Sequence, residues 1–175
     1  MFTEVELKYP VKDFTEIRGN LLQAGAELYC EATAEKNTVF DLPDGSLKHS
    51  GTLLRLREFR GEVILTVKES GLPGAMKIRH EHETVLSIPI GEAKELLKAL
   101  NYSPVFHYEK TREMWHLADK AHICLDTLFF GKFVEIEADS QLGVSNTSLI
   151  LDLDPGKGLN LSYKKLQLLY EARGG

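Results

Sequence analysis

Polar and apolar residues alternate along several short stretches of this chain, a pattern typical of β-strands whose two faces meet different surroundings. Near the start, Glu4, Glu6 and Lys8 alternate with apolar neighbours such as Val5 and Leu7. The same pattern predicts eight strands, at residues 2–9, 27–40, 52–58, 63–68, 77–88, 106–117, 123–128 and 132–138.

Turn residues divide the predicted strands. Pro10 is expected to end the first strand, because proline donates no backbone hydrogen bond. The Arg60-Gly61 pair predicts a hairpin turn, Pro43-Asp44-Gly45 predicts another turn, and the Ser70–Gly74 stretch predicts a loop. Residues 155–158 lack the spacing of a phosphate-binding loop, so we interpret them as a plain turn.

Helical periodicity appears at four places around these strands. The first helix, closed by Gly25, is expected to bury a stripe made of Phe14, Ile17, Leu21 and Leu22. The second, over about residues 92–100, is expected to pack outside the sheet and to bury Leu96, Leu97 and Leu100. A third helix is expected to start near Thr147. A fourth is expected to follow Ser162, which would be its N-cap. The predicted fold class is therefore α+β, with a mostly antiparallel sheet.

One face of the predicted strands carries almost only charged residues. These are Glu4, Glu6, Lys8, Arg55, Arg57, Lys68, Lys77, Arg79, Glu81, Glu83, Lys110, Arg112, Asp126, Glu135 and Glu137. The solvated face of an ordinary antiparallel sheet usually includes more uncharged polar residues. The charged face is either open to water or wrapped inward around a polar ligand and water, as in a barrel. We favour ligand binding over a plain solvated sheet.

Composition places few further limits on the protein. The 175 residues suit a single domain, and the net charge of −5 argues against a nucleic-acid partner. Cys30 and Cys124 are too few for a disulfide framework and are expected to be reduced and buried. There is no apolar run of membrane-spanning length and no secretion-signal pattern at the start. We expect a cytoplasmic protein that binds no membrane.

The chemistry that needs such a face is the binding of a polyphosphate. Arginine contacts phosphate oxygens in pairs, and lysine contributes a point charge. Carboxylates in the same cavity would repel an anion unless a divalent metal bridges the two. Oxygen ligands without His or Cys fit Mg²⁺ or Mn²⁺ better than Zn²⁺. Cations, acids and a hard metal together are typical of phosphoryl transfer.

Other conspicuous residues have simpler interpretations. His80 and His82 alternate with the charged set and are expected on the outer surface. Tyr108, Met114 and Trp115 are expected to serve packing rather than to hold a base.

The motifs together resemble one family. Glu4-x-Glu6-x-Lys8 is similar to the ExExK motif of the CYTH superfamily, the triphosphate tunnel metalloenzymes. The further matching segments are 54–57, 65–68, 79–83, 110–112, 125–126, 131–137 and 162–163, in the family's order. The resemblance covers nearly the whole chain and implies one CYTH-type domain over residues 1–175. It also implies a closed antiparallel eight-stranded barrel with helices packed outside.

The resemblance also implies roles for the charged residues. The implied metal ligands are Glu4, Glu6, Glu135 and Glu137, with Glu81 and Glu83 near them. The implied triphosphate contacts are Arg55, Arg57, Lys68, Lys77, Arg79, Lys110 and Arg112. Lys8, Arg112 and Asp126 are expected to act in catalysis, Asp126 as an orienting carboxylate. Mg²⁺ or Mn²⁺ is the expected cofactor.

The resemblance leaves the reaction open. The family includes class IV adenylyl cyclases, thiamine triphosphatases and inorganic triphosphatases. Hydrolysis of a small-molecule triphosphate is the leading hypothesis, and cyclisation of ATP to cyclic AMP and pyrophosphate is the alternative. Cyclase-like members often carry Asp and Tyr where this chain has Asn37 and Val39. A non-catalytic polyphosphate-binding module and a partner-binding sheet are weaker hypotheses, and a homodimer is left open.

Overall fold

A computed structural model describes residues 2–71, 74–117 and 121–174 of the chain. Within the loop expected at Ser70–Gly74, Leu72 and Pro73 lie outside the described residues. No helix of the described segments is long and apolar enough to cross a membrane.

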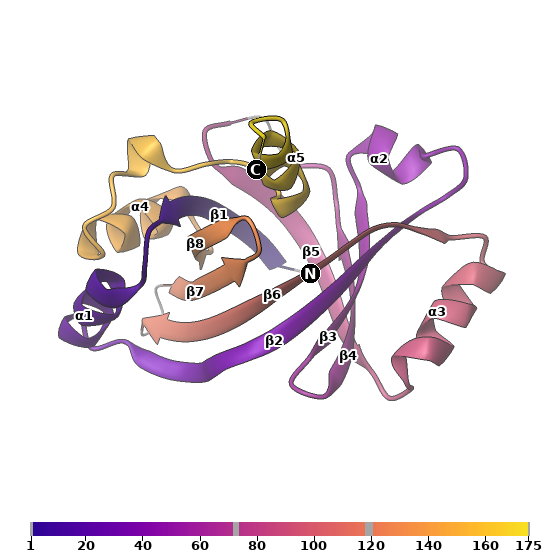
Figure 1. Cartoon of the computed structure of the whole chain (residues 1–175), viewed down its shortest axis with the longest axis horizontal. Helices are drawn as coiled ribbons and strands as arrows, with labels where there is room; N and C mark the ends of the chain where they lie inside the picture. Colours follow the sequence, from indigo (N-terminus) through magenta and orange to yellow (C-terminus); the bar gives the residue numbers. More distant parts are fainter. Residues whose placement is uncertain (1, 72–73, 118–120, 175) are drawn as a thin grey trace.

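Eight antiparallel strands close into a barrel in the order β1-β5-β4-β3-β2-β6-β7-β8 (Figure 1). The strands are β1 (Phe2–Val11), β2 (Glu27–Asp41), β3 (Leu53–Phe59), β4 (Glu62–Lys68), β5 (Lys77–Leu86), β6 (Ser103–Leu117), β7 (Ala121–Leu128) and β8 (Gly131–Ala138). The predicted α+β class and the closed eight-stranded barrel are confirmed. Strand β1 closes the barrel, because it pairs with both β5 and β8.

The prediction that Pro10 ends the first strand was wrong. Strand β1 continues to Val11 and pairs with β8 through Pro10. Pairing with β5 covers only Phe2–Glu6, so the second half of β1 has a strand neighbour on one side only. Proline is tolerated there because its missing N–H falls at an edge.

Six helical segments accompany the barrel. They are α1 (Thr15–Gln23), α2 (Ser46–Ser50), α3 (Ile90–Ala99), α4 (Gln141–Ile150), the 3₁₀ turn η1 (Pro155–Lys157) and α5 (Tyr163–Glu171). Ser162 caps α5 as predicted, since its hydroxyl accepts a hydrogen bond from the Lys165 amide at 3.3 Å. Helix α4 begins well before the expected start near Thr147, at a Ser140 N-cap.

Helix α2 was not predicted, because its five residues are fixed by a side chain outside the helix, at the end of β2. The Asp41 carboxylate accepts hydrogen bonds from the backbone amides of Leu47 and Lys48, at 3.0 and 3.1 Å. Gly45 and Gly51 bound the helix with φ of 70° and 77°, a backbone conformation that favours glycine.

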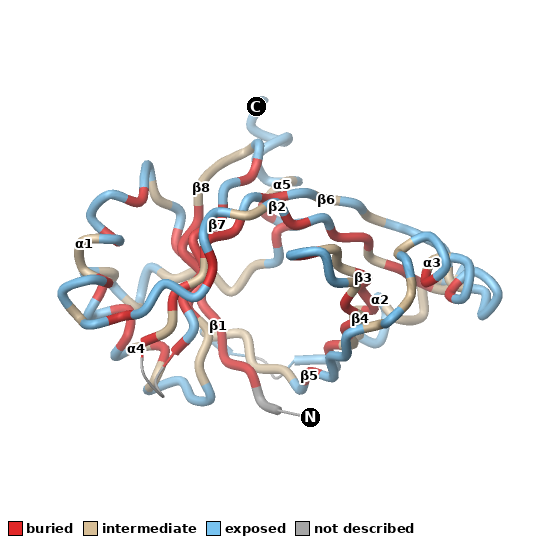
Figure 2. The backbone as a smooth tube through the Cα atoms, turned by 90° about the horizontal axis from the view of Figure 1, so that it is seen from below, coloured by how far each residue is buried: buried red, intermediate tan, exposed pale blue. Residues whose placement is uncertain are grey.

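The helices cover the apolar outer face of the barrel. Helices α1 and α4 lie beside β1, β7 and β8, and α3 lies across the molecule near β3 and β4 (Figure 1). The main core joins residues such as Leu7, Ile123 and Ile136 of the strands to Leu21 and Val144 of the helices. Many residues of β1, β7 and β8 are accordingly buried (Figure 2). The charged face must therefore point into the barrel.

Two predictions of helix orientation were wrong in part. Leu22, expected in the stripe of α1, is 65% exposed. In α3, Leu96 and Leu100 are 55% and 67% exposed, whereas Ala93 and Leu97 are buried. Ala93 and Leu97 stand one turn apart and so share the helix face that contacts the barrel.

Candidate active site

The charged residues predicted for one strand face lie together inside the barrel. Ten of them are buried despite their charge: Glu4, Glu6, Lys8, Arg55, Lys68, Glu81, Lys110, Arg112, Asp126 and Glu135. Arg57, Lys77, Arg79 and Glu137 are half-buried, and Glu83 is more exposed. Side chains of alternate strand residues point to one face, and closure of the barrel makes these faces converge. Their specific roles remain predictions.

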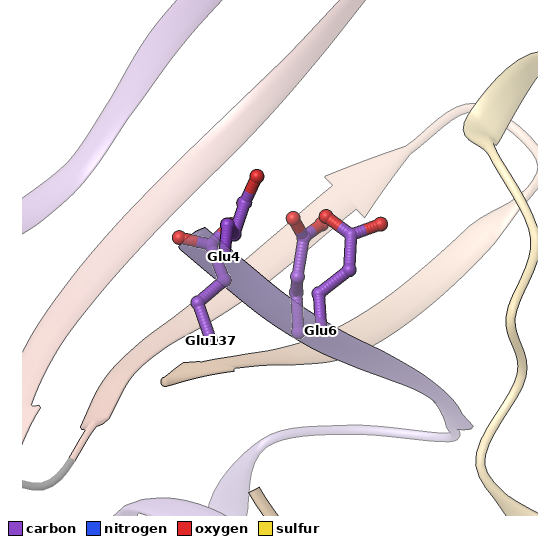
Figure 3. A group of neighbouring side chains, drawn as sticks. Glu4, Glu6 and Glu137 are labelled. Carbon is purple, nitrogen blue, oxygen red and sulfur yellow. The ribbon is translucent and has the colours of Figure 1, made fainter. Parts of the chain in front are cut away.

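Four carboxylates form a cluster between β1 and β8. One oxygen from each of Glu4, Glu6, Glu135 and Glu137 lies within 4.8 Å of the others. Register explains this, because Glu6 pairs with Glu137 and the neighbouring acids fall two residues away on the same face. In Figure 3, Glu4, Glu6 and Glu137 carry their carboxylates on the same side of the paired strands. We call these residues the four-glutamate cluster.

Three lysines approach the four-glutamate cluster. Lys8 Nζ lies 2.8 Å from Glu6 Oε1 and 3.2 Å from Glu135 Oε2. Lys68 Nζ lies 2.7 Å from Glu4 Oε2 and is shared with Glu81 at the same distance. Lys77 pairs with Glu6. Among the described residues, none forms an ion pair with Glu137.

Because the lysines pair with some of the four glutamates and not with others, the pKa values of these glutamates differ. Burial raises the pKa of Glu4 to about 7, although Lys68 opposes the rise. Burial and the charges of Glu4 and Glu135 raise the pKa of Glu137 well above its ordinary value. Burial also disfavours the charged form of Glu6, but Lys77 and Lys8 outweigh it and hold the Glu6 pKa below its usual range. A cation at the cluster would favour the charged form of all four acids.

A second buried group is centred on Asp126 of β7. Arg112 donates from Nε to Oδ1 at 2.7 Å and from Nη2 to Oδ2 at 2.6 Å. Lys110 Nζ and the Tyr163 hydroxyl donate to Oδ2 at 3.0 and 2.6 Å. The Tyr163 hydroxyl also lies 3.0 Å from Glu135. Asp126 is completely buried and has hydrogen-bond donors on both oxygens.

Sequence reasoning missed Glu35, a fully buried acid on β2. Its carboxylate lies 3.3 Å from Lys110 Nζ and 3.8 Å from both Arg57 Nη1 and Arg112 Nε. Asn37 donates to Glu35 Oε1 at 2.8 Å. Burial raises the pKa of Glu35, but Lys110, Arg112 and Arg57 outweigh it and hold this pKa well below its usual range. Glu35 and Asn37 are two residues apart and therefore share one face of a strand, and this spacing was the available signal that both point into the barrel.

Tyr163 lies in segment 162–163, which matches the family, but no role was predicted for it from the sequence. Its ring lies 5.2 Å from Lys8 Nζ and 5.0 Å from Lys110 Nζ, measured to the ring centre. Burial and the neighbouring Asp126 and Glu135 raise its pKa well above the ordinary value, so the hydroxyl keeps its proton. Helix α5 thereby places a neutral donor between two acids of the barrel interior.

The structure divides Glu81 and Glu83 between two sites. Glu81 lies near the four-glutamate cluster through the shared Lys68. Glu83 instead accepts two hydrogen bonds from Arg57 Nη2, at 2.9 and 2.8 Å, and one from Thr66 at 2.8 Å. The two-residue step along β5 moves Glu83 away from the cluster and toward the arginines of β3.

Three buried arginine N–H groups lack an acceptor within the described part of the chain. Among the described residues, no hydrogen-bond partner reaches Nε of Arg55, Arg57 or Arg79. Such groups are costly to bury, and a bound anion would satisfy them. The interior therefore offers unused donors on β3 and β5 and clustered acids on β1 and β8.

The four-glutamate cluster suits a hard divalent cation. It contains only carboxylate oxygens, the ligand type of Mg²⁺ and Mn²⁺. Mg²⁺ binds oxygens at about 2.0–2.1 Å, so opposite ligands of an octahedron stand about 4.2 Å apart. The spacing within the cluster, up to 4.8 Å, accommodates such an ion after small side-chain shifts.

The simpler expectations were confirmed. His80 and His82 are exposed on β5, and His82 Nε2 lies 2.9 Å from Glu69. Trp115 is buried in the main core. Cys30 and Cys124 are free and buried.

Comparison with known proteins identifies similar chains. The family model of the CYTH domain matches residues 3–146. A candidate adenylate cyclase of Vibrio parahaemolyticus has a TM-score of 0.81 and 25% identity, covering 95% of this chain and 98% of that chain. The PH1819 protein of Pyrococcus horikoshii OT3 has a TM-score of 0.78 and 28% identity over the same shares.

A more distant structure shares the fold alone. The candidate adenylyl cyclase HpAC1 from Hippeastrum, described as having a dominant triphosphatase activity, has a TM-score of 0.64 and 17% identity. The match covers 86% of this chain and 84% of that one. No curated protein matches the sequence.

Proposed function

This chain belongs to the CYTH domain family, and we propose on that basis that it is a divalent-metal-dependent enzyme that binds and hydrolyses a small-molecule triphosphate. We further propose that residues 1–175 form one domain of this type. The observation that carries the proposal is the placement of the four-glutamate cluster inside the same closed barrel as the interior arginines and lysines. Binding of an anion alone would be stronger without those acids, so their presence supports metal-assisted catalysis over a simple binding module.

The four-glutamate cluster would hold Mg²⁺ or Mn²⁺, which neutralises phosphate charge and polarises the phosphoryl group when bound. Glu81 stands close by and pairs with Lys68. Lys8 contacts Glu6 and Glu135 and favours their charged, ligating form.

The cations provide the phosphate contacts in this proposal. They are Arg55, Arg57, Lys68, Lys77, Arg79, Lys110 and Arg112. The unpartnered Nε groups of Arg55, Arg57 and Arg79 supply donors that no described acceptor uses. Asp126 positions Arg112 and Lys110 by accepting hydrogen bonds from both. Fixed donors of this kind stabilise the charge of a transferred phosphoryl group without reorganising.

Cyclisation of ATP is the alternative, supported by the similarity to the Vibrio candidate adenylate cyclase. It requires the ribose 3′-hydroxyl to be aimed at the α-phosphorus, whereas hydrolysis requires an aligned water at the terminal phosphorus. We favour hydrolysis because Asn37, at a position where cyclase-like members often carry Asp, has its amide donating to Glu35.

A panel assay tests both reactions. Inorganic triphosphate, thiamine triphosphate and ATP are each incubated with Mg²⁺ or Mn²⁺, and released phosphate and cyclic AMP are measured. We expect phosphate release that needs the metal and stops with chelator. Cyclic AMP without phosphate release would favour the alternative, and full turnover in excess chelator would contradict the role of the cluster.

Matched variants connect the activity to the barrel interior. Glu6→Ala should remove most turnover while leaving the fold, because Glu6 belongs to the charged interior rather than the apolar core. Glu109→Ala is the control, since Glu109 is an exposed acid on the outer face of β6. Equal loss in both variants would argue against a specific role for the cluster.

A further inference from the structure

A row of four ionisable residues crosses the sheet at one end of the barrel. In register, Glu27 of β2 pairs with His116 of β6, His116 pairs with His122 of β7, and His122 pairs with Glu137 of β8. Directly paired residues of antiparallel strands share a face and have side chains in reach of one another. The row therefore places two imidazoles side by side, flanked in register by two acids.

The two histidines lie on the barrel-interior side of their strands. His116 is four residues from Arg112, and His122 is four residues from Asp126, so alternation gives them the same face as those interior groups. The neighbouring pair, Trp115 and Ile123, packs in the main core on the opposite face. None of the interactions described above for the four-glutamate cluster or Asp126 uses the two imidazoles.

Their geometry matches that of ligands to one metal ion. The two Nδ1 atoms lie 3.4 Å apart, and the ring centres are 4.8 Å apart. Nitrogens that each lie about 2.0–2.1 Å from a tetrahedral zinc ion are separated by about 3.3–3.4 Å. The spacing that allows a hydrogen bond between the rings thus also suits a shared ion, without movement of the strands.

The pair is also accessible to a cation from solvent. His122 is exposed and His116 is half-buried, so an ion can reach both from solvent. Among the described residues, the pair has no third His, Cys, Asp or Glu at ligand spacing, so an ion held there would need water in its other coordination positions.

We propose that His116 and His122 form a second metal site, distinct from the four-glutamate cluster, that binds a transition-metal ion such as Zn²⁺. The ligand types separate the two sites, because imidazole prefers Zn²⁺, Cu²⁺ and Ni²⁺ whereas carboxylates alone suit Mg²⁺ and Mn²⁺. The proposal does not depend on the reaction that the enzyme performs.

Calorimetric titration with Zn²⁺ tests the site. The protein is first saturated with Mg²⁺, so that the four-glutamate cluster is occupied. We expect one equivalent of Zn²⁺ to bind, and His122→Gln and His116→Gln each to weaken binding at least about tenfold, because loss of even an outer-shell partner costs that much. His82→Gln, which changes an exposed histidine on β5, is the control and should leave the affinity unchanged.

Paramagnetic broadening in the unmodified protein provides an independent test. Substoichiometric Cu²⁺ should broaden the imidazole NMR signals of His116 and His122 before those of the other four histidines. Zn²⁺ affinity that is the same in both variants and the unmodified protein would overturn the proposal. Uniform broadening of all six histidine signals would overturn it as well.

Discussion

The barrel contains two groups of buried acids that the protein treats differently. Asp126 and Glu35 are fully buried and have arginine and lysine partners that the chain itself provides. In the four-glutamate cluster, Lys68 is shared with Glu81, and Glu137 forms no ion pair with any described residue. The first group is neutralised by the fold. In the second, lysine and arginine compensate Glu6 and Glu135 but leave Glu4 and Glu137 with raised pKa values, a condition that a metal ion would relieve.

The pKa shifts express the same difference. The pKa of Glu35 is held low by Lys110, Arg112 and Arg57, which outweigh its burial. Burial instead raises the pKa values of Glu4 and Glu137, since fixed cations do not compensate it. Acids that resemble each other in the sequence therefore divide into one set that holds the strands together and one set suited to a ligand.

Substituting one acid from each group should give the largest contrast. Asp126→Asn should lower the free energy of unfolding by about 3–5 kcal/mol, because it leaves buried cations without their partner. Glu137→Gln should leave the stability of the metal-free protein nearly unchanged, because the raised pKa of Glu137 already keeps this carboxyl group largely uncharged. Urea denaturation measures both, and an equal loss in the two variants would remove the distinction between the groups.

Metal and triphosphate together should stabilise the protein through the second group. Ligands that bind only the folded state raise its stability by about 2.7 kcal/mol at a hundred times Kd. We expect inorganic triphosphate with Mg²⁺ to raise Tm clearly, and Glu6→Ala to abolish most of the rise. Sulfate at equal ionic strength is the control, and an equal rise with sulfate would indicate general anion binding instead.

Glu4 of the four-glutamate cluster and Glu35 should respond to pH in opposite directions in metal-free buffer. Glu4 has a pKa of about 7 when folded and 4.5 ordinarily, so its contribution is full below pH 4.5 and is lost as pH rises through 7. The lowered pKa of Glu35 gives a contribution that is present above its ordinary value and lost as pH falls below it. Melting curves of Glu4→Gln and Glu35→Gln across this range should each lose one of these dependences, and unchanged curves would contradict the assignment.

The smallest effect is expected at Arg57, which contacts Glu35 of the first group and Glu83. Its pair with Glu83 is partly exposed, so Arg57→Lys should change stability by less than about 1 kcal/mol. It should still raise KM for a triphosphate, because lysine cannot reproduce two-point contact with phosphate. Steady-state kinetics would measure the change, with Arg60→Lys at the exposed hairpin turn as control. An unchanged KM would place Arg57 outside the phosphate path.

Many interior residues could be predicted because side chains on any strand point to the same face at every second residue. Glu6, Arg112 and Glu135 were found by alternation alone, without knowledge of which strands pair. On β2, register shifts at Leu28/Cys30 and Cys30/Thr33 interrupt the period ahead of Glu35. Tyr163 reaches the interior from a helix, so strand periodicity carries no information about its position.

The errors on the helices have a different physical origin. Because leucine is more hydrophobic than alanine, Leu96 and Leu100 were predicted to be buried against the barrel, and Ala93 was not. A small side chain such as Ala93 lets the helix approach the strands closely, so fit rather than hydrophobicity decided which face is buried. In α2, the Asp41 carboxylate fixes the helix by hydrogen bonds that local propensity does not describe.

Closure of the barrel through β1 also determines when the four-glutamate cluster assembles during folding. Of the eight strands, β1 is synthesised first and its partner β8 is synthesised last. Contacts of such long sequence separation form late, because a long loop must close before they are gained. Lys110, Arg112 and Asp126 belong to the adjacent strands β6 and β7 and assemble from a local hairpin. The nascent chain thus carries no assembled four-glutamate cluster until β8 has docked on β1.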